Sequence, residues 1–153
     1  HSKVGARAMN IADICSHRVV SLPLGASLAD AVALMYGERV GTVIVTRAVA
    51  ARSIVAGILT DRDIVHAQLD KVADFSQMSI AAAMASSPLV VQGDDDATEV
   101  LHRLQGRGVR RAPVIDEFGA PIGLISTDDL LQHIARQISG LATVVSNQLG
   151  SGG

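Results

Sequence analysis

The sequence has very few aromatic residues and a single cysteine. Only 2% of its 153 residues are aromatic, none is tryptophan, and 48% are hydrophobic. A packed core must therefore be built from Val, Ile, Leu, Ala and Met, and the composition argues against a disordered chain. Cys15 has no partner for an internal disulfide, which is typical of a reducing compartment and predicts a cytoplasmic protein.

Excess positive charge and long apolar runs are also missing. The formal net charge is −2, and Lys3 and Lys71 are the only lysines. Bulk charge therefore gives no reason to expect a nucleic-acid partner. No apolar run approaches the roughly 20 residues that cross a bilayer, so we expect no membrane span. The first residues do not form a signal-peptide pattern.

One eight-residue pattern is present twice. GILTDRDI runs from Gly57 to Ile64, and GLISTDDL runs from Gly123 to Leu130. Upstream, SLADAVALM (27–35) matches DATEVLHRL (96–104), and VGTVIV matches VRRAPV. Matches that recur in register indicate a duplicated structural unit.

Each repeat has the pattern of a β-α-β-β-α unit, so the predicted fold class is α/β (α+β). Capping-box spacings, Ser27 with Asp30 and Asp96 with Glu99, indicate where the first helix of each repeat begins. The predicted strands are residues 19–22, 42–46 and 54–59, then 89–92, 112–115 and 122–125, and the second helices are 61–69 and 127–138. The central apolar strands are expected to be buried on both faces.

The predicted division of the chain has four parts. An N-terminal segment (1–10), whose first two residues read as a tag remnant, precedes a first unit (11–76) and a second unit (77–138). Residues 139–153 form a C-terminal helix or tail, with an expected break near Gly140. Residues 130–149 have the pattern of an amphipathic helix, and its apolar stripe is expected to pack on the module or on a second subunit; the stripe consists of Leu131, Ile134, Ile138 and Leu141.

The repeated pattern has two readings. Thr60 with Asp63, and Ser126 with Asp129, have the spacing of a capping box, which is a purely structural role. The same groups also suit a nucleotide, because a capped helix N-terminus attracts phosphate and a carboxylate accepts hydrogen bonds from ribose hydroxyls. A glycine precedes each copy, where a backbone or a ligand can come close.

The duplicated pattern, the RRAPVID segment (110–116) and the SLADAVALM helix together resemble a tandem pair of CBS domains, a family named for cystathionine β-synthase. The resemblance extends from about Ile11 to His133. It implies two β-α-β-β-α units packed about a pseudo-twofold axis, usually as a homodimer. It also implies a regulatory module that binds AMP, ADP, ATP, S-adenosylmethionine or NAD between the units and acts on a separate, unknown partner protein.

The resemblance also implies roles for individual residues. Asp63 and Asp129 would hold ribose hydroxyls, with Thr60 and Ser126 beside the ribose or phosphate. Further residues implied in nucleotide binding are Gly57, Arg62, Thr42, Val43, Arg110, Arg111, Ala112, Pro113 and Gly123. Their expected roles are backbone contacts to adenine from the strand segments and phosphate contacts from the arginines.

The two sites are expected to differ in occupancy. Gly41 and Thr42 stand where the second repeat has Arg110 and Arg111, and they offer no cation to a phosphate. Arg62 is the candidate phosphate contact of the first site.

No catalytic motif accompanies the repeats. There is no P-loop and no Gly-x-Ser-x-Gly elbow, and Gly106-Arg107-Gly108 lacks the third glycine of a dinucleotide fingerprint. The histidines lack metal-ligand spacing, and the acidic run Asp94–Asp96 is typical of a loop and helix cap. We therefore expect no enzyme, no metal and no obligatory cofactor.

Three hypotheses remain at this point. The first is a nucleotide-sensing module, and the second is a structural dimerisation scaffold with vestigial sites. The third is a small nucleotide hydrolase that uses the acidic run. Saturable nucleotide binding would favour the first hypothesis, and a stable dimer without such binding would favour the second. Turnover of ATP would favour the third.

Overall fold

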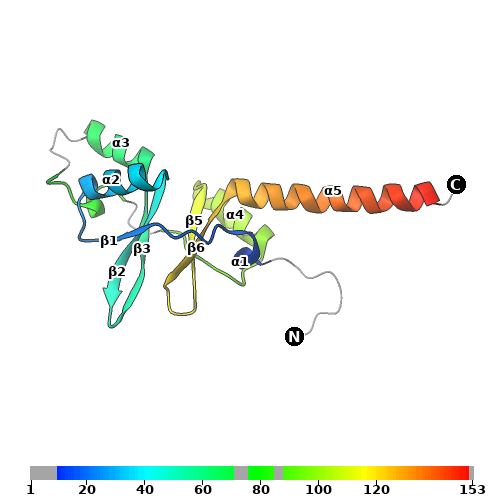
Figure 1. The fold of residues 1–153 in the computed structure, drawn as a ribbon, viewed down its shortest axis with the longest axis horizontal. Helices are drawn as coiled ribbons and strands as arrows, with labels where there is room; N and C mark the ends of the chain where they lie inside the picture. The colour runs from blue at the N-terminus through cyan, green and yellow to red at the C-terminus, as the bar shows by residue number, and fades with distance from the viewer. Residues whose placement is uncertain (1–9, 71–75, 85–87, 152–153) are drawn as a thin grey trace.

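Each repeat folds into a three-stranded sheet with two helices, as the sequence predicts. The structure is a computed structural model that describes residues 10–70, 76–84 and 88–151, and Figure 1 shows two similar units followed by a long helix. The first unit contains β1 (Ser21–Pro23), α2 (Leu28–Glu38), β2 (Thr42–Val49), β3 (Arg52–Thr60) and α3 (Asp61–Asp70). The second contains β4 (Val91–Gln92), α4 (Ala97–Arg107), β5 (Arg111–Ile115), β6 (Pro121–Ser126) and α5 (Thr127–Ser151). A short helix α1 (Ile11–Ile14) precedes the first unit, and a 3-10 turn η1 (Ile80–Ala82) precedes the second.

The two sheets have the same topology. Their orders are β1-β2-β3 and β4-β5-β6, with the first pair of strands parallel and the second antiparallel. In both, the register shifts directly after the pair that contains the motif glycine, Val45 with Gly57 and Val114 with Gly123. The shared irregularity supports the duplication and confirms the predicted mixed α/β fold of two β-α-β-β-α units.

The predicted starts of the first helices are confirmed. The Asp30 N–H donates to Ser27 Oγ at 3.1 Å, and the Ser27 N–H donates back to Asp30 Oδ2 at 3.0 Å. In the second unit the Glu99 N–H donates to Asp96 Oδ2 at 3.1 Å. Each bond satisfies an N–H of the first helical turn that has no partner within the helix.

Each unit has its own aliphatic core. One cluster includes Val43, Val45 and Leu59, and the other includes Val114 and Ile125, all fully buried. The first part of β2, residues 42–46, is buried throughout, as expected for a strand covered on both faces.

The units are joined by contacts that the sequence does not predict. The Val55 N–H donates to the Gly119 carbonyl at 2.9 Å, and the Arg52 guanidinium lies 3.6 Å from the centre of the Phe118 ring. In addition, Ser16 pairs with Leu124 through two backbone hydrogen bonds of 3.0 and 2.9 Å. The segment that leads into the first unit therefore extends the sheet of the second.

Helix α5 is continuous from Thr127 to Ser151, so the expected break near Gly140 is wrong. A single helical glycine costs only about 1 kcal/mol relative to alanine, and there is no proline here to end the helix. The predicted boundary between residues 138 and 139 falls inside this helix, which extends well beyond the two sheets (Figure 1). Among the described residues, no helix is both long and apolar enough to cross a membrane.

The C-terminal caps of α2 and α4 differ in one informative way. Arg39 ends α2 with φ 57°, whereas Gly108 ends α4 with φ 63°. A side chain in this left-handed conformation costs about 1–2 kcal/mol, and a glycine avoids that cost.

Replacing Arg39 by glycine should therefore raise the free energy of unfolding by roughly 0.5–1 kcal/mol, after the greater freedom of glycine in the unfolded chain is deducted. Urea denaturation measures this change, and Gly108→Ala is the matched control, with an expected loss of about 1 kcal/mol. A less stable Arg39→Gly variant would contradict the explanation.

Candidate functional site

Both copies of the repeated pattern form the predicted capping box. The Asp63 N–H donates to Thr60 Oγ1 at 3.1 Å, and the Thr60 N–H donates to Asp63 Oδ2 at 2.9 Å. Ser126 and Asp129 exchange the same two bonds, both at 3.1 Å. The structural reading of the motif is confirmed. It does not exclude the other reading, because each cap uses only Oδ2 of the carboxylate.

Strand register places each capping hydroxyl beside a residue of the neighbouring strand. Thr60 is paired with Thr42, and Ser126 is paired with Arg111. Thr60 and Ser126 end their strands, both aspartates lie in the first turn of the following helices, and all four residues are half-buried and outside the cores.

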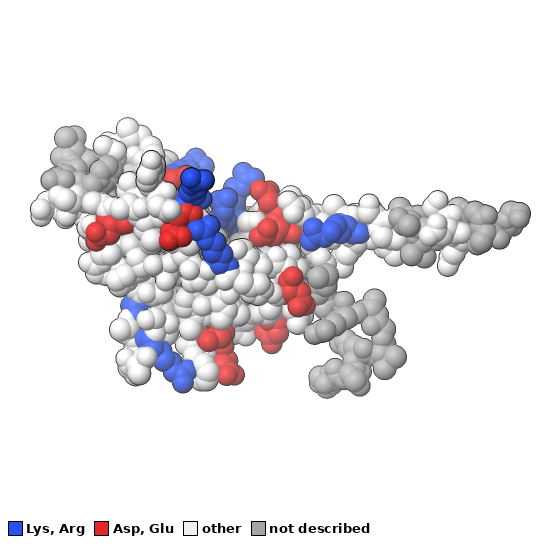
Figure 2. Space-filling model, viewed as in Figure 1, with Lys and Arg blue, Asp and Glu red and all other residues white. Residues whose placement is uncertain are grey.

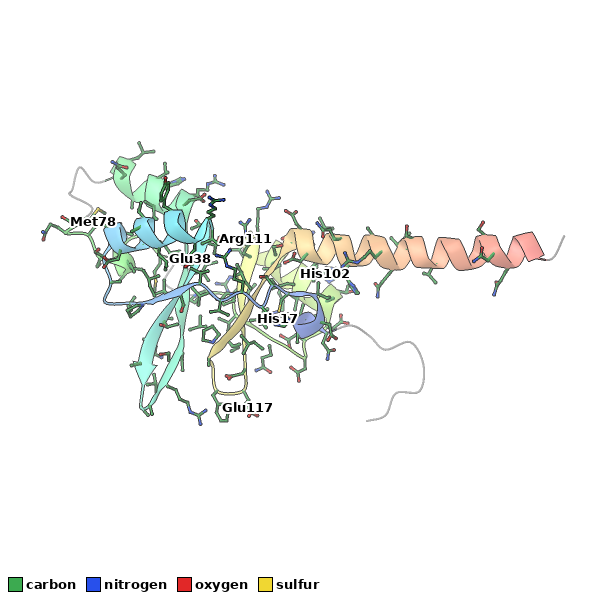
Figure 3. The ribbon with its side chains drawn as sticks, in the orientation of Figure 1. His17, Glu38, Met78, His102, Arg111 and Glu117 are labelled. Carbon is green, nitrogen blue, oxygen red and sulfur yellow. The ribbon has the colours of Figure 1, made fainter. Side chains whose placement is uncertain are left out.

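Thr42 and Arg111 meet in one cleft between the two units. Its volume is about 270 Å³, and its walls come from the segment before β1 and from β2, β5 and β6. The lining residues are Ser16, Arg18, Val20, Val40, Gly41, Thr42, Ile44, Arg111 and Leu124. Figure 3 shows Arg111 between the two sheets. Because both units contribute, the cation that Gly41 and Thr42 lack is supplied by Arg111 of the other repeat.

Arg18 is a second cation in this cleft, and the sequence analysis missed it. Its guanidinium donates to the Glu38 carbonyl at 2.8 Å and to Glu38 Oε2 at 2.7 Å, so its position is set by the end of α2. No motif surrounds Arg18 in the sequence. The pairing of Ser16 with Leu124, together with the packing of Ile11 in the core of the second unit, holds this segment against that unit and brings Arg18 near Arg111.

Several predicted site residues have no side chain available to a ligand. The side chains of Val43, Ala112 and Pro113 are buried, so only their backbone groups could take part. Arg110 is exposed but does not line the cleft, and its carbonyl accepts a hydrogen bond from the Thr127 N–H at 2.8 Å.

The motif glycine of the second copy has a structural reason. A Cβ atom at Gly123 would lie 2.6 Å from the Ser16 carbonyl oxygen and 2.8 Å from Cys15 Sγ. The close approach for which glycine is needed at this position is therefore made by the chain itself. Gly57 is buried and has the equivalent place in the register of the first sheet.

Arg62 and Asp63 line a different depression. A groove of about 350 Å³ lies between α3 and η1, and its walls also include His66, Ala67, Ala82 and Ala83. The two copies of the motif thus have different surroundings, and Asp129 is the copy adjacent to Arg111 through Ser126.

Charges near the cleft have mixed sign. Figure 2 shows basic side chains gathered where the two units meet, with acidic side chains beside them.

Burial raises the pKa of the Cys15 thiol, and the nearby Asp129 carboxylate adds to this rise, so the thiol stays protonated near neutral pH. Within the described part of the chain, no group of three or more His, Cys, Asp or Glu side chains could hold a metal ion.

Comparison with known families gives the same result for both units. The model of the CBS domain matches residues 11–70 and again residues 78–136. The chain belongs to the CBS domain family. Tandem CBS domains are regulatory modules that bind adenine nucleotides, and proteins of this kind are typically regulatory and not catalytic.

Similar proteins come from several organisms. An uncharacterized protein of Methanopyrus kandleri is 24% identical over 82% of this chain, which spans 63% of that protein. The CBS domain of a bacterial CNNM/CorC family Mg²⁺ transporter, solved in complex with ATP, is 27% identical with a TM-score of 0.68, covering 83% of this chain and 87% of that one. A hexameric CBS-CP12 protein from bloom-forming cyanobacteria is 29% identical with a TM-score of 0.72, covering 83% and 72%.

Proposed function

We propose that this CBS pair binds an adenosine-containing nucleotide in the cleft between its units and transmits occupancy to a partner protein. The observation that carries the proposal is that Arg18 and Arg111 line one inter-unit cleft, and that Arg111 is paired in register with Ser126 of the Ser126–Asp129 cap. The groups in this arrangement match the three parts of a nucleotide.

The base would occupy the apolar part of the cleft. Val20, Ile44 and Leu124 supply apolar walls, and the backbone of Gly41 and Thr42 supplies amide groups at its edge. Apolar walls with a few polar groups for orientation are typical of small-ligand sites. The volume of about 270 Å³ lies just below the roughly 300–1,000 Å³ of such sites, which suits a nucleoside with its phosphates directed toward solvent.

The phosphates would lie between the two arginines. Guanidinium groups bind phosphate oxygens through paired, charge-assisted hydrogen bonds. Arg18 is already oriented by Glu38, so less side-chain freedom is lost when an anion binds. Glu38 also neutralises part of its charge, so Arg111 is the stronger of the two contacts in this proposal.

The ribose would bind to Asp129. Its Oδ2 is used in the helix cap, and Oδ1 remains to accept from a ribose hydroxyl. Asp63 belongs to the second proposed site, which lacks the paired arginines of the cleft, so the two sites should fill unequally. The ATP complex of the related transporter domain supports a nucleotide ligand of this class.

Regulation would follow from linkage between binding and the angle of the two units. Because both units line the cleft, a ligand that fits one angle better shifts the population toward it. The proposal includes a cytoplasmic location, a homodimer and no catalysis. The apolar face of α2 and α3 supports a dimer, because its large apolar side chains are exposed; these are Val32, Tyr36, Val65 and Leu69.

Calorimetric titration with AMP, ADP, ATP, S-adenosylmethionine and NAD tests the proposal, using wild type, Asp129→Asn and Asp63→Asn. The two substitutions are matched, since each removes one charge from an equivalent helix cap. We expect Asp129→Asn to weaken the tighter binding step roughly five- to a hundredfold, from the loss of a hydrogen bond worth about 1–3 kcal/mol. Asp63→Asn should leave that step unchanged.

Two other outcomes have definite meanings. If only Asp63→Asn weakens the tighter step, the occupied site is the other one and the assignment of this cleft is wrong. If no nucleotide gives heat with folded, ligand-free protein, the motifs are helix caps alone. The dimerisation scaffold then becomes the better account of the chain.

A further inference from the structure

Helix α5 has an apolar stripe that the described residues of its own chain leave exposed. Leu131, Ile138 and Leu141 are 51%, 63% and 67% exposed. Ile134, in the same stripe, packs partly against the core of the second unit. The stripe therefore begins at the body of the module and continues along the helix as it extends outward (Figure 1).

The spacing of the stripe is typical of helix pairing. Its members follow one another at intervals of three, four and three residues, from Leu131 to Leu141. Alternating intervals of three and four add up to a seven-residue period, and this period keeps the stripe facing a second helix. Surface helices that pack on a sheet have a broader apolar face.

The last part of α5, residues 137–151, is a weak helix by itself. Most of these residues are Gly, Ser, Thr, Val or Asn, which have low helix propensity. An isolated helix of about 15 residues is marginal in water even with good helix formers. Continuous helix in this segment is therefore best explained by a partner that covers the stripe.

We propose that α5 pairs with the α5 of a second copy of this chain. The segment 137–151 contains no Asp, Glu, Lys or Arg. Two identical helices can therefore lie together along it without placing like charges opposite each other. A partner with a charged helix would gain no ion pairs here, whereas a second copy presents the same uncharged surface with the same spacing.

This pairing is separate from the nucleotide site and from the α2–α3 face. None of the stripe residues lines the inter-unit cleft. The part of α5 beyond Gln137 is about 20 Å long, so we expect a shared surface smaller than the roughly 1,200–2,000 Å² of a standard interface. Pairing is therefore expected to depend on protein concentration.

Light scattering coupled to size-exclusion chromatography, over a range of protein concentrations, tests this inference with the full chain. The test variant is Ile138→Glu/Leu141→Glu, which places two charges in the stripe. The proposed α2–α3 dimer should remain, so we expect the mass of this variant at high concentration to be half that of a wild type in which α5 pairing joins two such dimers. Its nucleotide affinity should not change, so a failure of this proposal is distinguishable from a failure of the proposed function.

The matched control is Gln132→Glu/Arg136→Gln, which changes the net charge by the same amount on the opposite side of the helix. This control should keep the wild-type mass. An uncharged variant, Ile138→Ala/Leu141→Ala, should raise the dissociation constant at least tenfold, and circular dichroism verifies that each variant is folded. A test variant with wild-type mass, or a control that loses mass equally, would overturn the pairing. A variant that only loses stability would show that the chain's own segments cover the stripe.

Discussion

Replacing Arg111 by alanine should weaken AMP binding about ten- to a hundredfold. Arg111 lines the inter-unit cleft and is paired in register with Ser126, so its guanidinium is the proposed main contact of the phosphate. A hydrogen bond to a charged group contributes about 1.5–3 kcal/mol, and each 1.4 kcal/mol changes affinity tenfold. Calorimetric titration of wild type and variant with AMP measures the loss directly.

Arg110→Ala is a closely matched control for this prediction. It removes the same charge one residue earlier, but Arg110 is exposed and does not line the cleft. We expect Arg110→Ala to retain most of the affinity, and we expect adenosine, which has no phosphate, to bind wild type and Arg111→Ala alike. Equal losses in the two variants would mean that a diffuse positive field binds the phosphate. A loss of adenosine binding would mean that Arg111 supports the cleft itself.

Replacing Gly123 by alanine should have the largest effect on stability. The added Cβ would lie 2.6 Å from the Ser16 carbonyl oxygen, which is much closer than van der Waals contact allows. Relief of this clash requires Ser16 to move, and its two backbone hydrogen bonds to Leu124 would lengthen or break. We expect the free energy of unfolding in urea to fall by about 2–3 kcal/mol, the upper part of the range for an overpacked core.

Gly106→Ala supplies the contrast. A Cβ at Gly106, within α4, meets no atom within 4 Å. Alanine should stabilise that helix by roughly 0.5–1 kcal/mol, so the two glycine substitutions have opposite signs. Wild-type stability of Gly123→Ala would show that the backbone at Ser16 can yield at little cost.

The same substitution links the fold to the site. Ser16 and Arg18 belong to one segment, and both line the cleft. If Gly123→Ala displaces this segment, the nucleotide affinity should fall together with the stability. The motif glycine would then act on the ligand only through the strand that it allows to approach.

The duplicated architecture could be predicted from the sequence because its causes are local. The caps at Ser27 and Asp96 depend on residues three positions apart, and the apolar strands depend on runs of a few residues. Both copies of the Thr/Ser-x-x-Asp box are also local, which explains why their hydrogen bonds agree with the spacing. The predicted break near Gly140 was wrong because a single glycine destabilises a helix only slightly, too little to end it.

The composition of the cleft could not be predicted in this way. Arg18 lies in a segment without a motif, and it lies near Arg111 because this segment packs on the second unit, where Ser16 pairs with Leu124 more than a hundred residues later. Such pairing depends on the packing of two complete units. The spacing of residues within a short segment does not predict it. For the same reason, the sequence indicated that Arg110 and Arg111 were equivalent, whereas in the structure only one of them lines the cleft.

The sequence alone thus determined the repeat, the secondary structure within each unit and the positions of the helix caps. These depend on short-range hydrogen bonds and on the periodicity of apolar residues. Only the tertiary structure decided which residues from the two units share a cleft. It also decided that the backbone of Ser16 fills the space beside Gly123. These follow from the packing of chain segments that are distant in sequence, where a separation of a few ångströms decides whether a side chain reaches a ligand.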